Sequence, residues 1–194
     1  MLKITKLGEE ILREKCQSVK AEEITDEFRT FLDEMFDTMI EANGVGLAAP
    51  QVGIAKRFFV VIADDDVRRV FINPEITKTS QEVGDYEEGC LSIPGVYENI
   101  SRPVKVSVTA LDQNGKRFTI EDADGLLARV IQHENDHLDG ILYIDRGDEK
   151  FREETIEKFK KRDERRSQKE KAKALKKARI EAKLAAKAEK KASK

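Results

Sequence analysis

The chain has 194 residues, of which 39% are hydrophobic and 38% are charged, with 36 Lys and Arg against 38 Asp and Glu. Its two cysteines exclude a disulfide framework, and the opening residues show neither a secretory signal core nor transit-peptide character. No apolar run approaches the roughly 20 residues that would cross a bilayer. We therefore expect a protein of the reducing cytoplasm, where a cysteine can act as a thiolate ligand.

The charges are divided unequally along the chain. Residues 151–194 contain 18 Lys and Arg against 8 Asp and Glu, a balance of +10, whereas residues 1–150 carry −12. All 11 glycines and all 4 prolines lie in residues 1–150, as the turns of a folded domain require. The sequence predicts one folded domain over 1–150 and a basic, Ala/Lys-rich helical tail over 151–194.

The first predicted element is a helix over "DEFRTFLDEMFDTMIEAN", residues 26–43. Its apolar residues recur at three-and-four spacing, which is typical of one buried helix face. This face consists of Phe28, Phe31, Leu32, Met35, Phe36, Met39 and Ile40.

Three short apolar runs follow, at residues 57–64, 70–76 and 104–112, and are rich in β-branched or aromatic residues. This composition predicts strands. Asn114 and Gly115 then lie between two such runs, which indicates a hairpin and antiparallel pairing.

Two segments between these elements carry small or reactive residues, and in the second Cys90 precedes a strand-like run, which places it at a strand edge or in a loop. "GVGLAAPQVG", residues 44–53, is neither a dinucleotide fingerprint nor a phosphate loop, and its small residues would let another backbone approach; a plain turn is the alternative. In "YEEGCLSIPG", residues 86–95, Cys90 is either a thiolate ligand or a small buried hydrophobe, whereas Cys16 is expected to be the latter.

Both histidines of the chain lie in "GLLARVIQHENDHLDG", residues 125–140. We expect a helix here, capped by Asp122 or Asp124 and ended by Gly140. His133 and His137 are then one turn apart on the same face, where they can share one metal ion, and Glu134 of this HExxH pattern can act as general base toward an attacking water.

A catalytic metal needs a third protein ligand, which must be Cys, Asp or Glu because no further histidine exists. The predicted fold is an α+β domain with antiparallel sheets packed around a central metal-binding helix, followed by a C-terminal helical extension.

"GVGLAAPQ", "EGCLS" and "QHENDHLDG", in this order and at these separations, resemble the three signature motifs of the peptide deformylases. The resemblance covers about residues 1–150 and implies removal of the formyl group from the N-terminal formylmethionine of new polypeptides. It also implies Cys90, His133 and His137 as metal ligands and Glu134 as the catalytic carboxylate. Gln51 and the backbone N–H of Leu91 would stabilise the oxyanion.

The substrate is expected to pair as an added strand with the backbone around Gly44 to Gly46, while an apolar pocket accepts the methionine side chain. By resemblance, the residues that line this pocket are Val45, Leu126 and Val130. Arg129 stands where an apolar residue is expected beside the pocket.

Two carboxylates near the motifs are candidates to support the ligands. Asp136 is expected to orient an imidazole or to pair with a cation, and Glu88 to bond local backbone or a basic partner. For both, a surface carboxylate is the alternative.

The tail from Phe151 to Lys194 has high helix propensity, with i,i+4 pairs such as Glu157 with Lys161. It is either a solvated charged helix or an arm that contacts ribosomal RNA, since clustered lysines displace counterions from phosphates. A membrane-surface helix fits poorly because the apolar stripe is thin.

Thiolate with two imidazoles suits Fe(II), Zn, Ni or Co, and the resemblance favours Fe(II). We expect a monomer. Two other hypotheses remain at this point: a zincin-type protease with a different third ligand, and a ribosome- or RNA-binding module with a structural metal.

Overall fold

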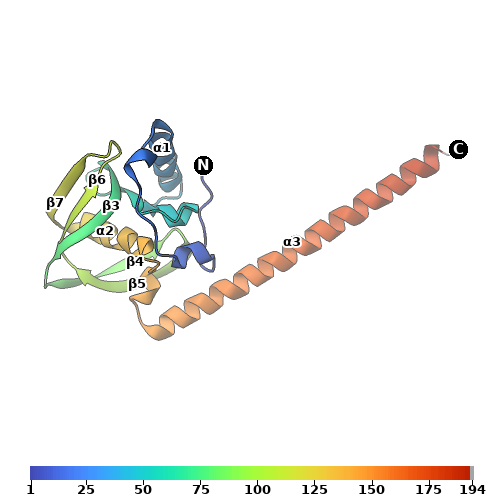
Figure 1. Cartoon of the computed structure of the whole chain (residues 1–194). Coiled ribbons are helices and arrows are strands. Elements are labelled where there is room, and N and C mark those ends of the chain that lie inside the picture. The colour runs from blue at the N-terminus through green and yellow to red at the C-terminus, as the bar shows by residue number, and fades with distance from the viewer. Residues whose placement is uncertain (193–194) are drawn as a thin grey trace. The chain divides into compact units, whose positions relative to one another are not determined.

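The computed structural model describes residues 1–192 and divides the chain into two compact units, Met1–Glu153 and Glu154–Lys194 (Figure 1). The first unit contains two antiparallel sheets and two α-helices. This arrangement confirms the predicted α+β class. Short 3-10 helices occur at Glu10–Arg13 (η1), Ala21–Glu23 (η2), Ala49–Val52 (η3) and Tyr143–Asp145 (η4).

Helix α1 runs over Asp26–Glu41, and the Thr25 side chain caps it by accepting a hydrogen bond from the Phe28 backbone N–H at 3.3 Å. Its buried residues are Leu32, Met35, Phe36, Thr38 and Met39. The prediction was wrong for Ile40, which is 48% exposed, because this residue lies about 90° from the centre of the buried face.

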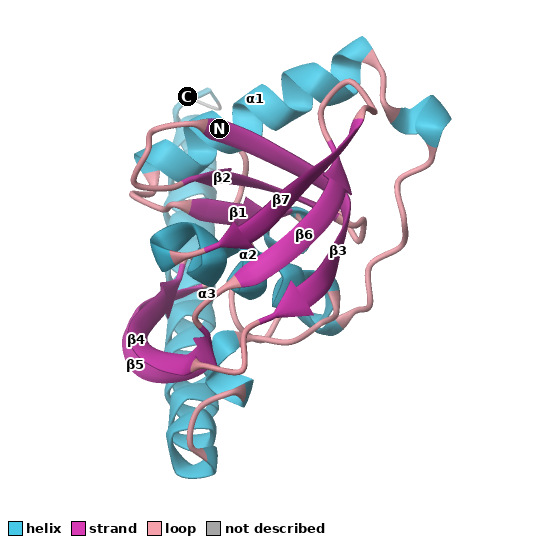
Figure 2. Cartoon of the chain, turned by 90° about the vertical axis from the view of Figure 1, so that its left-hand side faces the viewer, coloured by secondary structure: helices cyan, strands magenta, loops and turns pink. Residues whose placement is uncertain are grey.

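The larger sheet has the strand order β1-β2-β3-β6-β7 (Figure 2). Its strands are Gly46–Ala48, Phe58–Ile62, Arg68–Thr79, Val106–Leu111 and Arg117–Ala123, in that order. The smaller sheet is a hairpin of β4, Val83–Cys90, and β5, Ile93–Pro103. The three predicted strands are confirmed, and Gly115 adopts φ +74° in the turn between β6 and β7.

Helix α2, Gly125–Leu138, packs against the sheet face opposite to α1. Strand β2 shows why both faces are apolar: Phe59 and Val61 belong to the core with α2, whereas Phe58 and Val60 belong to the core with α1. Alternate residues of a strand point to opposite faces, so a strand covered on both sides is apolar throughout.

The ends of α2 agree only partly with the prediction. Asp124 occupies the N-cap position but makes no capping side-chain bond, and Asp122 ends up in β7 at φ +47°. Gly140 is left-handed as expected, at φ +72°. A methyl group at this position would also lie 2.5 Å from the Arg13 carbonyl oxygen, so Gly140 lets the chain turn closely against η1.

The second unit is formed by helix α3, Glu149–Ala192, which starts just before the unit boundary. The predicted pair within it is present, with Lys161 Nζ at 2.9 Å from Glu157 Oε1. Ser193 and Lys194 of the predicted tail lie outside the described residues. Across the described part of the chain, no helix has the length and apolar character to span a membrane.

Candidate active site

Cys90, His133 and His137 come together where the end of β4 meets α2. Cys90 ends β4 at an irregularity in its pairing with β5, and the histidines lie one turn apart on α2. Cys90 Sγ is 3.3 Å from His137 Nε2, and the ligand atoms of all three residues lie within 4.8 Å of one another. A tetrahedral site with bonds of roughly 2.0–2.3 Å would place its ligand atoms about 3.5 Å apart. The three donors therefore fit one metal ion.

A histidine binds a metal ion only through an unprotonated ring nitrogen, so the protonation of the two imidazoles also matters. His133 Nδ1 is 2.9 Å from Glu88 Oε2, which leaves Nε2 for the ion, and burial lowers the pKa of His137 well below its usual range. Burial lowers the pKa of His133 as well, but hydrogen bonds to Cys90 and Glu88 outweigh this effect and raise it to about 10. A cation and a proton therefore compete for His133.

Glu134 lies beside these ligands on α2 and is 4% exposed. Burial raises the pKa of its carboxyl group to about 7, and its Oε2 atom is buried without a hydrogen bond to the described residues. A methyl group on Gly46 would lie 2.4 Å from Glu134 Oε1 and 2.7 Å from Val130 Cγ1. Gly46 therefore allows side chains of α2 to approach the backbone of β1 closely. The sequence analysis expected the approach of another backbone segment instead.

Gln51 lies in η3 and is 1% exposed. Its Oε1 accepts a hydrogen bond from the Ala48 backbone N–H at 2.8 Å, which fixes the amide. Its Nε2 donates to Ser92 Oγ at 3.2 Å and to Cys90 Sγ at 3.4 Å. The amide donor of Gln51 is thus directed at the cysteine ligand.

A cavity of about 650 Å³ opens beside these groups. The expected site residues that line it are Gly44, Val45, Gly46, Gln51, Cys90, Leu91, Leu126, Val130, His133 and Glu134. His137 does not line the cavity and is 1% exposed. Strand β1, which begins at Gly46, is at the edge of the larger sheet, so its outer side is not paired with another strand of the described residues.

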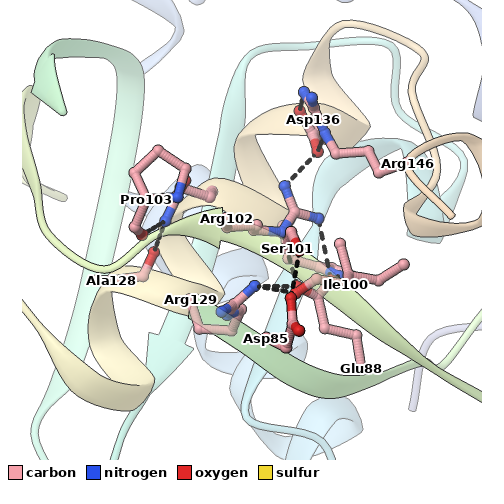
Figure 3. Close-up of polar contacts among 12 residues, drawn as sticks. Asp85, Glu88, Ile100, Ser101, Arg102, Pro103, Ala128, Arg129, Asp136 and Arg146 are labelled. Atoms are coloured by element: carbon pink, nitrogen blue, oxygen red, sulfur yellow. Dashed lines mark hydrogen bonds and ion pairs between the residues drawn. The ribbon is translucent and has the colours of Figure 1, made fainter. Parts of the chain in front are cut away.

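A largely buried network of charges includes Glu88, which contacts His133; Figure 3 draws the acidic and arginine side chains of this network. Glu88 accepts hydrogen bonds from Arg102 Nε at 2.7 Å and from Arg129 Nη1 at 3.1 Å, in addition to its contact with His133. Asp136 pairs with Arg102 and Arg146, each at 2.6 Å, so it bonds to cations rather than to an imidazole. Neither carboxylate is the surface residue that the alternative interpretation expected.

Arg129 lines the cavity, although an apolar residue was expected there. It remains buried because Nη1 also donates to the Ile100 carbonyl at 2.8 Å and Nη2 to the Gly84 carbonyl at 2.7 Å. Its guanidinium lies over the ring of Tyr86, 5.6 Å from the ring centroid. Arg102 and Arg146 were not predicted, because no local pattern marks an arginine as the partner of a distant carboxylate.

An α+β domain that brings a cysteine and two histidines together, next to a buried carboxylate and a cavity, has the architecture of a metal-dependent hydrolase. A family model described as polypeptide deformylase matches residues 1–153. The peptide deformylase of Treponema pallidum strain Nichols is 54% identical over 153 residues, which cover 79% of this chain and 92% of that protein. The peptide deformylase of Fusobacterium nucleatum is 50% identical over 144 residues, 74% and 82% of the respective chains.

Solved structures show the same relationship. A peptide deformylase from Synechococcus elongatus, crystallised in complex with actinonin, has 43% identity and a TM-score of 0.75 over 81% of this chain and 86% of that chain. One from Legionella pneumophila has 40% identity and a TM-score of 0.76 over 85% and 98%. The chain belongs to the peptide deformylase family. It is accordingly a metal-dependent hydrolase that removes the N-formyl group of nascent polypeptides.

Proposed function

We propose that residues 1–150 are the catalytic domain and that Cys90, His133 and His137 hold its single divalent ion. The match of the family model to residues 1–153 and the compact unit Met1–Glu153 support this boundary. When bound, the ion would supply Lewis-acid chemistry at the formyl carbonyl and lower the pKa of water. The convergence of the three ligand atoms within 4.8 Å, from β4 and α2, is the observation that carries the proposal.

Glu134 moves the proton in this proposal. Its buried carboxylate accepts a proton as water attacks the formyl carbon and returns it to the departing amine, so that formate and a free N-terminus result. A carboxyl group with a pKa of about 7 is suited to both steps near neutral pH. The close fit against Gly46 restricts where this carboxylate can move.

Gln51 Nε2 and the backbone N–H of Leu91 stabilise the carbonyl oxygen as it becomes negative. Gln51 is supported in this role by its fixed amide, because Oε1 is held by the Ala48 N–H. To donate to the substrate oxygen, Nε2 exchanges its long 3.4 Å contact with Cys90 Sγ for the new acceptor. One such donor is commonly worth about 10²–10³ in rate.

The formylmethionine side chain enters the cavity between Val45, Leu126 and Val130. The backbone of the substrate pairs with Gly44 to Gly46 as an added strand, which the edge position of β1 supports. Gly44 has a packing reason to be small, since a methyl group there would lie 2.7 Å from Leu91 Cδ1.

The test is formate release from a formyl-Met dipeptide under anaerobic conditions. Glu134→Ala should keep its metal content and lose about 10²–10⁴ in turnover, whereas Glu121→Ala, at an exposed carboxylate of β7, should match the wild type. Intact turnover in Glu134→Ala would refute the role of the carboxylate. No formate release from the metal-loaded wild type would instead favour the hypothesis of an RNA-binding module with a structural metal.

We further propose Fe(II) as the native ion, on the family resemblance and on a thiolate-imidazole donor set that also accepts Zn, Ni or Co. Cys90→Ser should lose most of its metal. Retention of metal in Cys90→Ser would instead favour a zincin-type site with another third ligand.

The remaining assignments concern the setting of the enzyme. Two free cysteines, one of them a thiolate ligand, support a reducing cytoplasm. The charge of +10 over residues 151–194 supports contact of the tail with ribosomal RNA. The monomeric state stays a prediction, which light scattering on the full chain would measure.

A further inference from the structure

The amino-terminal segment Thr5–Leu7, here called the amino-terminal clip, contacts both loops that carry the proposed oxyanion donors. On the Gln51 side, the Thr5 backbone N–H donates to the Gln51 carbonyl at 2.8 Å. The Thr5 hydroxyl donates to the Pro50 carbonyl at 3.0 Å. Thr5 is 6% exposed, so these bonds to η3 are shielded from water.

The same clip holds the turn after Cys90. Lys6 Nζ donates to the Leu91 carbonyl at 2.7 Å, and the Leu7 backbone N–H donates to the Ser92 carbonyl at 3.0 Å. The bond from an ammonium group is charge-assisted and therefore stronger than a bond between neutral groups. Leu7 is buried, at 6% exposure, which anchors the clip in the core.

These contacts matter because the two donors come from distant parts of the sequence. Gln51 and Leu91 lie 40 residues apart in the chain, in η3 and in the turn between β4 and β5. Their loops are also joined by the bond from Gln51 Nε2 to Ser92 Oγ. Donors that act on a developing charge must be held within a fraction of an ångström, and supporting residues usually supply this precision.

We propose that the amino-terminal clip is a positioning element for the oxyanion donors, with Lys6 as its main positioning residue. The clip fixes the distance between η3, which carries Gln51, and the turn that carries Leu91. Both donors can then bind the same substrate oxygen. This inference rests on the proposed function, because the clip can affect catalysis only if Gln51 and the Leu91 N–H are the oxyanion donors.

The experiment compares Lys6→Met with Lys6→Arg, which keeps a charged donor, and with Lys3→Met, which removes a lysine whose side chain is 84% exposed. Formyl-Met dipeptide turnover, metal content and melting temperature are measured for each. Lys6→Met should lower kcat about tenfold to a hundredfold, less than or equal to the loss of a whole donor, with KM changed less than about twofold. Lys6→Arg should recover most of kcat, and Lys3→Met should match the wild type.

A second readout does not depend on activity. Amide hydrogen exchange at Leu91 and Ser92 should become faster in Lys6→Met, while exchange in β2 stays unchanged. If the wild type released no formate while this exchange still became faster, the proposed function would fail, and the clip would hold the two loops without a catalytic purpose.

The positioning role is wrong if kcat is unchanged in Lys6→Met. It is equally wrong if kcat falls only in proportion to lost metal or lost folded protein. If Lys6→Met does not fold, the same measurements are made on Lys6→Gln, which has a shorter polar side chain. Failure of both variants to fold would assign Lys6 to stability and overturn the proposal.

Discussion

Glu88 contacts the proposed metal ligand His133 and is not itself one of the proposed ligands. Burial would raise its pKa, but hydrogen bonds from His133 and Arg102 outweigh burial and lower the pKa to about 2. The carboxylate is therefore charged and faces three cationic or hydrogen-bonding groups at once. One of its contacts fixes the His133 ring, and this connects the network to the ligand set.

Glu88→Gln should weaken metal binding about 10- to 100-fold, because the amide cannot orient His133 in the same way and removes one of the two carboxylates that pair with Arg102. Competition with a chelator of known affinity measures the change. Asp85→Asn is the matched control, since Asp85 lies on the same strand, is exposed and bonds Ser101. Equal metal affinity in Glu88→Gln and Asp85→Asn would contradict this role.

The two cysteines should differ sharply in reactivity. Burial raises the pKa of the Cys16 thiol to about 11, and Cys16 is 5% exposed, whereas Cys90 lines the cavity. Metal-free protein treated with iodoacetamide at about pH 8 should carry one adduct, at Cys90, by peptide mass mapping. Reloading with Zn²⁺ or Fe(II) should prevent it, and labelling of Cys16 at the same rate would be inconsistent with its burial.

At the level of elements, the sequence predicted the strands and helices whose buried positions are apolar. Strand β2 and helix α1 belong to this class, since hydrophobic periodicity follows directly from burial. The hairpin of β4 and β5 was missed because Glu88 and Arg102 occupy buried positions in it. A strand that buries charges in a network has no apolar alternation to detect.

The sequence also predicted one part of the candidate site and missed another. The expected ligands and donors were predicted, because they lie in the three motifs, where they are close together in sequence or match a family pattern. The partners of Glu88 and Asp136 could not be predicted, because Arg102 and Arg146 reach them from separate elements. Lys6 was missed for the same reason, as it lies 85 residues from Leu91 in the chain.

Arg129 is one of several residues that attach the β4–β5 hairpin to α2. Arg129→Met would leave the carbonyl groups of Gly84 and Ile100 without these donors, while Glu88 keeps its bonds to Arg102 and His133. We expect a loss of about 2–4 kcal/mol, from the cost of unsatisfied buried groups. For a protein of this size the melting temperature should fall by about 5–15 °C.

Calorimetry of metal-saturated protein tests this expectation. Arg117→Met, at an exposed arginine of β7, provides the control for loss of one positive charge. A melting temperature within about 2 °C of the wild type in Arg129→Met would show that the hairpin is held by its other bonds. One of these is the bond from Gln132 to the Pro103 carbonyl at 3.0 Å.

At the scale of the whole molecule, the charge is divided between a negative amino-terminal part and a positive carboxy-terminal part. The lysines at positions 169, 171 and 173 are exposed on α3. Changing all three to glutamate lowers the charge of residues 151–194 from +10 to +4. If the tail contacts ribosomal RNA as proposed, this change should weaken binding at least about tenfold and make its salt dependence shallower, since affinity for RNA depends on released counterions.

Changing the same three lysines to arginine preserves the charge and is the matched control for helix length and solvation. Formate release from a dipeptide should be equal in both variants, because a substrate this short needs only the cavity of the first unit. Gel-shift titrations at several salt concentrations measure RNA binding separately from turnover. If the glutamate variant bound ribosomal RNA with the wild-type salt slope, the tail would be a solvated helix, and its proposed contact with ribosomal RNA would be refuted.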